Sequence, residues 1–460
     1  MSTAVTTGRR RWAVLAVVLF AAILDLLDAT ITNLAAPTIA ADLSGGEPLI
    51  QWLGSAYALS MGVLLVVGGR LGDKYGRRRL FLVGVTGFTL ASVACGLAWD
   101  PVSIVVFRLL QGALGALLIP QGFGILGAVF PREELGKAFG VFAPALGLAS
   151  IGGPILAGVL IDADLLGLGW RAMFLINIVL GGLAVVLAVR LLPRDEGERA
   201  VKVDGPGSGL LAAAMLGLLY GLIDGAGHGW TPRAAACLAA GAVFFVLFAR
   251  RQRTAPSPLI EPSLLRNRGF VSGLTLGLVF NAAVSGLLFL LALFLQDALH
   301  RTPTQASASL APLAAGIVVA SVASHRLLDR LGRRLILTGL LITLTGALWL
   351  LALGTGPAVW ALVPPVLVIG LGLGSCFGSV YQVTLGGVDA RESGSASGAL
   401  SASQQLANSV GAAAVTTVYL HTAGGVTAGL TVVAAALVAC CGLVRLLPGR
   451  RPVEGAHAGG

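Results

Sequence analysis

Almost the whole chain consists of long apolar stretches separated by short polar or charged loops. Fourteen of these stretches are long enough to cross the roughly 30 Å hydrocarbon core of a bilayer as helices. Their approximate centres are Leu24, Met61, Thr89, Ala116, Ser150, Gly182, Met215, Gly241, Gly286, Ile317, Thr343, Leu373, Val410 and Val433. This pattern predicts an all-α polytopic membrane protein embedded in a lipid bilayer.

The charged residues support this prediction and define a topology. Only 11% of the residues are charged, compared with about 25% in soluble domains, and the mean hydropathy is +0.89. If the stretches alternate across the membrane, 27 of the 31 Lys and Arg residues lie on the side of both termini and three on the opposite side. The positive-inside rule then predicts cytoplasmic termini and a multi-pass protein of the cell membrane. Because this topology explains the net charge of +10, no nucleic-acid partner is predicted.

A charged loop motif occurs twice and divides the chain into two halves. The first copy spans residues 70–78 (RLGDKYGRR), and the second lies 256 residues later, at 326–334 (RLLDRLGRR). Each copy follows the second stretch of a group of six, as expected for a secondary transporter built from two repeats. We therefore predict an N-terminal six-helix bundle over 1–193, a linker with two inserted helices over 194–264, a C-terminal six-helix bundle over 265–447 and a cytoplasmic tail over 448–460.

Two carboxylates lie in the middle of the first apolar stretch. Asp25 and Asp28 are three residues apart, so on a helix their side chains project from one face, within about 60° of each other. A charge at the centre of a bilayer costs roughly 2.5–3.5 kcal/mol, so such residues usually face other helices or a water-filled cavity. Asp28 is our principal candidate for a proton site and Asp25 the second. The alternative is that one of them lies at the helix end among headgroups, or bonds to a neighbouring threonine.

The sequence gives little support for other chemistry. The five cysteines lie in apolar stretches without CxxC spacing, so neither a disulfide framework nor a metal site is predicted. The five histidines are scattered at loops and at the ends of stretches, which argues against an enzyme embedded in the membrane. No phosphate-binding loop of the form GxxxxGKS or GxxxxGKT occurs, so we expect no cofactor and a proton gradient as the energy source.

The loop sequence GGRLGDKYGRRR resembles the signature between the second and third helices of the major facilitator superfamily. Its glycines allow a tight turn and close helix approach, and its acidic residue can pair with cations or lie at a helix N-terminus. The resemblance implies that this loop holds the two halves together on the cytoplasmic side in the outward-facing state. The residues concerned are Gly69, Arg70, Gly72, Asp73, Gly76, Arg77 and Arg78.

The fourth stretch contains RLLQG at residues 108–112, which is similar to the RxxQG motif of the same family. The resemblance implies a role in proton transfer for Arg108, with Gln111 beside it. Arg108 is the only base that we place inside a span, and an arginine there needs a partner, for which Asp28 or Asp25 is the obvious candidate. The alternative is that Arg108 extends from a helix end to the headgroups.

The fifth stretch reads GLASIGGPILAG and resembles the antiporter signature of the family. Small residues let helices approach closely, and proline removes a backbone hydrogen bond, so this helix could bend and seal one side of the protein. The signature is found in exporters and is largely missing from uptake members, so the resemblance implies export. Its residues are Gly147, Gly152, Gly153, Pro154 and Gly158.

Three further stretches are similar to the fourteen-helix drug/proton antiporters of this family. They are LDATITNLAAP at residues 27–37, WRAMFLIN at 170–177, and SASG followed by QQ at 395–405. The second half offers no clear intramembrane acid, so polyvalent organic cations are a less secure substrate prediction. Its candidate cavity-lining residues, which could instead bond between helices, are Asn281, Tyr381, Gln382, Gln404 and Asn408.

The resemblance implies a proton-coupled antiporter that exports amphipathic organic compounds, such as drugs or antibiotics, by alternating access. Protonation of Asp28, assisted by Asp25 and Arg108, would change the charge of a cavity between the halves. We expect a monomer whose partners are protons and a small amphipathic organic substrate. A proton-coupled uptake symporter of a small organic solute is an alternative, and a membrane-embedded enzyme is a less favoured one.

Overall fold

The computed structural model is built of long helices throughout the part of the chain that it describes. That part comprises residues 8–131, 167–197, 204–295, 309–353, 359–389, 392–422 and 425–447, with isolated positions between 134 and 156 and at 299 and 305. The helices are α1 (Gly8–Asp42), α2 (Gly46–Tyr75), α3 (Arg77–Gly96), α4 (Pro101–Gly115), α5 (Leu118–Val129), α7 (Arg171–Leu191), α8 (Gly205–His228), α9 (Pro232–Thr254), α10 (Pro262–Arg266), α11 (Arg268–Leu293), α13 (Ala311–Leu331), α14 (Arg333–Leu353), α15 (Val359–Leu385), α16 (Ser393–His421), α17 (Gly425–Leu443) and the 3₁₀ helix η3 (Val444–Leu446).

Eleven segments of the described residues are long and apolar enough to cross a membrane, and each contains one of the predicted centres. The predicted centre at Ile317 lies in α13, whose apolar part, Ala311–Ser324, is shorter. The centre at Val410 lies in α16, a 29-residue helix with many Ser, Thr and Gln residues. The stretch around Ser150 falls mostly outside the described residues. The prediction of a multi-pass membrane protein is therefore confirmed. Of the fourteen predicted membrane-spanning stretches, eleven coincide with a candidate span among the described residues.

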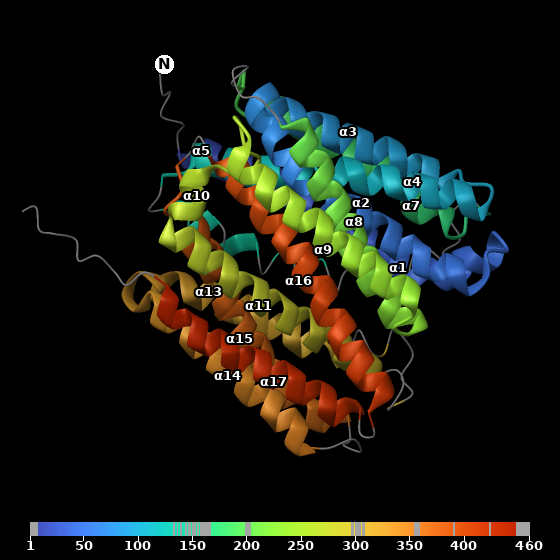
Figure 1. Cartoon of the computed structure of the whole chain (residues 1–460), viewed down its shortest axis with the longest axis vertical. Coiled ribbons are helices and arrows are strands. Elements are labelled where there is room, and N and C mark those ends of the chain that lie inside the picture. Colours follow the sequence, from blue (N-terminus) through green and yellow to red (C-terminus); the bar gives the residue numbers. More distant parts are fainter. Residues whose placement is uncertain are drawn as a thin grey trace, which may run out of the picture.

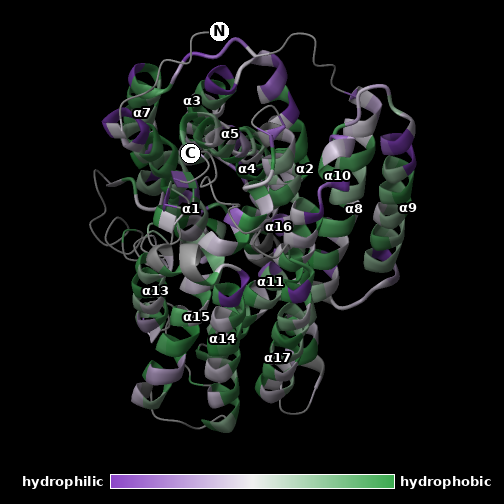
Figure 2. Cartoon of the chain, turned by 90° about the vertical axis from the view of Figure 1, so that its left-hand side faces the viewer, coloured by the Kyte–Doolittle hydropathy of each residue, from purple (hydrophilic) through white to green (hydrophobic). Residues whose placement is uncertain are grey.

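The helices form two groups with an inserted pair beside them (Figure 1). Helices α1, α2, α3, α4 and α7 pack on one another, as do α11, α13, α14, α15, α16 and α17. Helix α16 joins the two groups because it packs against α2 and α5 of the first. Helices α8 and α9 pack together as a hairpin, and α8 contacts both α2 and α16. Apolar residues predominate along the helices, and strongly hydrophilic residues gather near the helix ends (Figure 2).

The stretch predicted as one span around Ala116 is two helices, because α4 ends at Gly115 and α5 begins at Leu118. Pro120 explains the break, since a proline has no N–H to donate to the carbonyl four residues earlier and its ring clashes with that carbonyl. Helix α2 comes close at this point: a Cβ on Gly68 would lie 2.8 Å from Ala116 O. Gln121 Nε2 also donates to Gly68 O at 2.7 Å. The broken helix therefore lies directly against α2.

Candidate functional site

A buried ion pair joins the first and fourth predicted spans. Arg108 Nη1 of α4 lies 2.6 Å from Asp28 Oδ2 of α1, and the exposed fractions of the two side chains are 0% and 1%. Arg108 Nε donates to Leu53 O of α2 at 3.0 Å, and its guanidinium carbon lies 4.4 Å from the centre of the Tyr57 ring. Arg108 therefore does not extend to the headgroups, and Asp28 is its partner.

Two amide side chains complete the surroundings of Asp28. Gln111 Nε2 and Asn177 Nδ2 donate to Asp28 Oδ1 at 2.8 and 2.9 Å. Asn177 Nδ2 also reaches Ser92 Oγ at 2.8 Å, and Gln111 Oε1 accepts from Arg108 Nη1 at 2.8 Å. Asp28 thus accepts three side-chain hydrogen bonds from α4 and α7. Hydrogen bonds of this kind keep the carboxylate fixed in one position.

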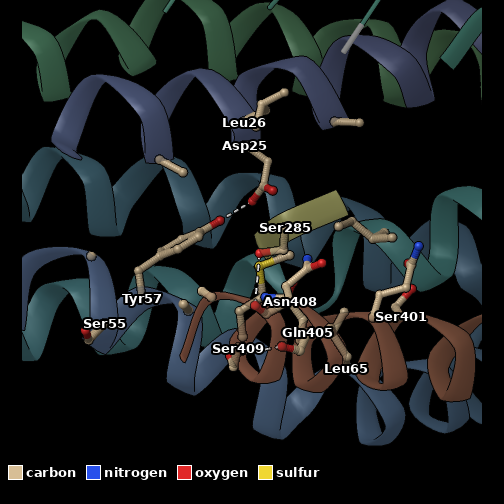
Figure 3. Close-up of a pocket in the computed structure, with 18 of the residues that line it drawn as sticks. Asp25, Leu26, Ser55, Tyr57, Leu65, Ser285, Ser401, Gln405, Asn408 and Ser409 are labelled. Carbon is tan, nitrogen blue, oxygen red and sulfur yellow. Dashed lines mark hydrogen bonds between the residues drawn. The ribbon is translucent and has the colours of Figure 1, made fainter. Parts of the chain in front are cut away.

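Asp25 has a different environment, although it lies less than one helical turn from Asp28. It accepts a hydrogen bond from the Tyr57 hydroxyl and points into a cavity (Figure 3). Gly115 of α4 leaves room for this pair, because a Cβ there would lie 3.1 Å from the Tyr57 hydroxyl and 3.2 Å from Asp25 Oδ1. The Tyr57 side chain therefore touches both carboxylate sites, through its hydroxyl to Asp25 and through its ring to the partner of Asp28.

The cavity has a volume of about 990 Å³ and lies between the two groups of helices. Among the described residues that line it, Asp25 is the acidic one and Arg108 the basic one. The wall on the side of the first group is otherwise mainly apolar and aromatic. Its members include Val18, Ala21, Ala22, Leu26, Ala29, Met61, Leu65, Phe81, Leu118, Ile119, Phe123 and Phe142.

A neutral polar stripe lies on the opposite wall. Its residues from α16 are Ser401, Gln404, Gln405, Asn408, Ser409 and Thr416 (Figure 3). Tyr381 of α15 also lines the cavity and donates to Gln404 Oε1 at 2.6 Å. The low hydropathy of α16 thus has a structural reason: its polar residues face the cavity. Of the remaining predicted lining residues, Asn281 bonds to Gly277 O within its own helix at 2.7 Å, and Gln382 is not among the lining residues.

The two groups also touch directly at one end of the cavity. Ser397 Oγ of α16 donates to Pro120 O at 3.3 Å, and a Cβ on Gly398 would lie 3.2 Å from Leu65 O. The rings of Phe123 and Tyr381 meet edge to face, with centroids 5.5 Å apart. These contacts bring the two groups together on the side of the cavity that is nearer to the charged segment at residues 70–78.

The segment predicted as a charged loop is the junction of two helices, because residues 70–75 belong to α2, Arg77 and Arg78 belong to α3, and Gly76 lies between them. Arg70 pairs with Glu261 at 2.8 Å, in the segment that leads into the second group, and Asp73 pairs with Arg77 at 3.0 Å. Arg77 Nη1 also donates to Gly124 O at 2.9 Å, and Arg78 Nη2 to Val189 O at 2.5 Å. Gly69 and Gly72 are buried in α2. The predicted pairing of Asp73 with a cation is thus observed.

The linker after α7 fixes the turn of this loop. Asp195 accepts hydrogen bonds from the backbone N–H groups of Arg77 and Arg78, at 2.5 and 3.0 Å, and so caps the start of α3. Gly76 has φ +93°, and a Cβ there would lie 2.7 Å from Asp195 O. Glycine is required at position 76 for both reasons. In the second copy of the motif, the side chains of Arg326, Asp329 and Arg330 lie outside the described residues.

Of the five signature residues named above, Gly153 belongs to the described residues, and Gly147, Gly152, Pro154 and Gly158 do not. Gly153 is buried. A Cβ atom added to Gly153 would lie 3.0 Å from the Cβ atom of Thr30 on α1. The helix that contains Gly153 therefore approaches α1 closely, as small residues allow.

Sequence reasoning missed three residues of the site. Tyr57 is a tyrosine in an apolar span, and its sequence surroundings give no sign of a polar partner. Asn177 lies in the stretch WRAMFLIN, where an amide within a span was a usable signal. Asp195 lies in the linker, and its capping role depends on a fold that brings it to α3 from 117 residues away.

Two packed groups of membrane-length helices, with a large cavity between them and a buried ion pair in its wall, define a membrane transporter. The profile of the Major Facilitator Superfamily matches residues 18–412, and the chain belongs to that family. Both the predicted family and its fold are thereby confirmed.

Curated relatives of this chain include antibiotic or multidrug exporters and resistance proteins. The chain is 44% identical to the probable actinorhodin transporter of Streptomyces coelicolor, over 90% of this chain and 73% of that protein. It is 33% identical to the tetracenomycin C resistance and export protein of Streptomyces glaucescens, over 88% of this chain and 75% of that protein. It is 34% identical to the puromycin resistance protein of Streptomyces alboniger, over 89% and 82%.

Solved structures show the same fold at low sequence identity. The human organic anion transporter MFSD10 matches with a TM-score of 0.70 and 16% identity, over 94% of this chain and 99% of that chain. The proton:xylose symporter XylE matches with a TM-score of 0.68 and 15% identity, over 94% and 95%.

Proposed function

We propose that this protein is a proton-coupled antiporter that exports amphipathic organic compounds, antibiotics among them, across the cell membrane. The names of the relatives support export of antibiotics. The cavity supports an amphipathic substrate, because a mainly apolar wall faces a neutral polar stripe. The single observation that carries proton coupling is a carboxylate, Asp25, at the cavity surface beside the buried Asp28–Arg108 pair.

In this proposal the two carboxylates have different tasks. Asp25 exchanges protons with the cavity, because its side chain lines the cavity. The hydrogen bond from the Tyr57 hydroxyl keeps the Asp25 carboxylate in position. Asp28 keeps Arg108 in place with the help of Gln111 and Asn177. Arg108 Nη2 has no hydrogen-bond partner among the described residues. Arg108 also borders the cavity. Its Nη2 group is therefore a donor that can interact with the Asp25 carboxylate when that carboxylate is charged.

The transport cycle then follows alternating access. The distribution of Lys and Arg predicts that residues 70–78 lie on the cytoplasmic side. In this proposal the contacts between the two groups on that side belong to the outward-facing state, from which substrate leaves and protons enter. Separation of the groups at Ser397, Gly398 and the Phe123–Tyr381 contact would open the opposite state. The proton gradient drives the cycle without a further cofactor.

Transport in inverted membrane vesicles tests the proposal. The panel is actinorhodin, tetracenomycin C and puromycin, which appear in the names of the relatives described above, and methylenomycin A, which appears in the name of a further relative, a resistance protein of Bacillus subtilis. We expect an acidic vesicle interior to drive uptake of at least one compound, and an uncoupler to abolish it. Asp25→Asn should abolish the gradient-driven uptake but retain exchange of labelled for unlabelled compound. Asp42→Asn is the matched control, because it makes the same change on α1 outside the span Gly8–Thr32.

The outcomes separate the parts of the proposal. Gradient-driven uptake at the wild-type rate in Asp25→Asn would exclude Asp25 as the proton site. Movement of a compound together with protons, rather than against them, would indicate a symporter. If no compound of the panel moves in wild-type vesicles, export of these antibiotics is refuted.

A further inference from the structure

We propose that α8, the first helix of the inserted pair, is a wall of the substrate site and binds the apolar part of the substrate. This inference rests on the proposed export function. In the sequence, the pair reads only as an insertion between two bundles. The structure instead places α8 against α2 of the first group and α16 of the second.

The three helices α2, α8 and α16 share one buried cluster. Met61 and Leu65 of α2, Leu211, Met215 and Leu219 of α8, and Ala402 of α16 belong to it. Their junction is at Gly62, where a Cβ would lie 2.8 Å from Leu219 Cδ1 and 3.5 Å from Gln405 Cβ. The helix α8 is therefore built into the seam between the two groups and is not merely attached to one of them.

Further along α8, three apolar side chains reach the cavity. Leu222, Ile223 and Ala226 line it together with Asp25 and with the polar stripe of α16. A substrate that places its oxygen and nitrogen groups on Gln405 and Asn408 has the apolar face of α8 next to its carbon skeleton. The chemical class that fits is a largely apolar molecule with several hydrogen-bonding groups along one edge.

A hydrogen bond to the second group and an aromatic contact to the first hold this part of α8 in position. Trp230 Nε1, just after α8, donates to Thr417 Oγ1 of α16 at 3.0 Å. The ring of Tyr220 lies 6.0 Å from that of Trp52 at the start of α2, and the Arg233 guanidinium lies over the Tyr220 ring at 5.3 Å. These contacts fix the helix end from both sides of the seam.

Helix α9 packs against α8 and has an exposed outer face. The two helices touch at the backbone, since a Cβ on Gly217 would lie 2.8 Å from Gly241 Cα. In the middle of α9 the exposed residues are apolar and include Phe244, Phe245, Val246 and Leu247, while its exposed arginines lie near the two helix ends. This pattern suits a helix whose outer face meets lipid, so that α8 separates the cavity from the bilayer on this side.

Cysteine labelling tests the placement without any need for transport. In intact cells, Ala226→Cys is treated with a charged, membrane-impermeant maleimide, and labelling is compared with that of the unsubstituted protein to correct for the native cysteines. Leu216→Cys on the same helix is the matched control, because Leu216 is 48% exposed and is not among the cavity-lining residues. We expect labelling of Ala226→Cys at least fivefold above that of Leu216→Cys. Equal labelling at both positions would overturn the proposal.

Protection and affinity then test contact with substrate. Each of the four antibiotics of the transport panel is added during labelling, and we expect at least one to slow the modification of Ala226→Cys. Leu222→Ala removes three carbon groups and should raise the concentration of that compound needed for half-maximal protection at least tenfold, as expected if about two of them are buried against the substrate. If Ala226→Cys is labelled but no compound slows it, α8 lines the cavity without binding substrate, and the inference fails. A failure of the export function is distinguishable, because it removes proton-driven uptake and leaves the labelling difference intact.

Discussion

The contrast between Asp28 and Asp25 predicts that the same substitution has very different effects on stability at the two positions. In Asp28→Asn, the buried Arg108 charge loses its partner. The new amide N–H group must also lie among donors, because Gln111 Nε2 and Asn177 Nδ2 already point at this site. In Asp25→Asn, the amide oxygen can still accept from the Tyr57 hydroxyl.

The magnitudes follow from burial. Removing one member of a fully buried ion pair costs about 3–5 kcal/mol of folding free energy, because an uncompensated charge is left behind. The exposed fractions of the Arg108 and Asp28 side chains, 0% and 1%, place this pair in that class. Weakening the single hydrogen bond at Asp25 should lower the folding free energy by no more than about 1.5 kcal/mol. Replacing both partners, with Asp28→Asn and Arg108→Gln together, should recover much of the loss, because no buried charge remains unpaired.

Thermal unfolding of the purified protein in detergent is the assay. We expect the midpoint to decrease in the order wild type, Asp25→Asn, the double variant, Asp28→Asn. Equal midpoints for Asp28→Asn and Asp25→Asn would refute the reasoning, because a sealed ion pair cannot lose one charge without cost. The result also decides how transport data are interpreted: lost transport in Asp28→Asn identifies a proton site only if the protein remains folded.

Three further predictions concern other parts of the structure. Gly76→Ala should lower the free energy of unfolding by about 1–3 kcal/mol, since the backbone there has φ +93°. Gly182→Ala on α7 is the control and should leave the midpoint unchanged or raise it, because no atom of the described residues lies within 4 Å of its Cβ position. Asn177→Ala removes a donor to the Asp28 carboxylate and should cost about 1.5–3 kcal/mol; an equal effect of Ile178→Ala, at a 51% exposed neighbour, would argue against that role. The hydrogen bonds from Trp170 and Arg171 lower the pKa of Asp42 below its usual value. Ionised Asp42 therefore contributes about 0.2–1 kcal/mol to the folding free energy, as is typical of an exposed pair. This contribution is present above the ordinary carboxyl pKa and is lost as the pH falls through the lowered pKa. The stability difference between wild type and Asp42→Asn, measured by unfolding from pH 7 to pH 3, should therefore shrink on acidification, and a constant difference would contradict this assignment.

The positions of the spans could be predicted because they depend on local composition. A helix that crosses hydrocarbon must satisfy its own backbone and present about 20 apolar residues, so all eleven candidate spans coincide with predicted centres. Helix α16 is the informative exception. Its polar residues reduce its hydropathy because they face the cavity, and only the packing of α16 against α2, α5 and α11 explains their positions.

The sequence by itself determined that Asp25 and Asp28 lie near one another on α1, because a spacing of three residues fixes their relative direction on any helix. Only the tertiary structure decided which of them is sealed and which meets the cavity. The partners of Asp28 come from positions 80, 83 and 149 residues away, and that of Asp25 from 32 residues away. No local pattern encodes such distances. A rotation of about 60° around one helix therefore separates a buried structural charge from a carboxylate open to the cavity, and the packing of α2, α4 and α7 around α1 fixes that rotation.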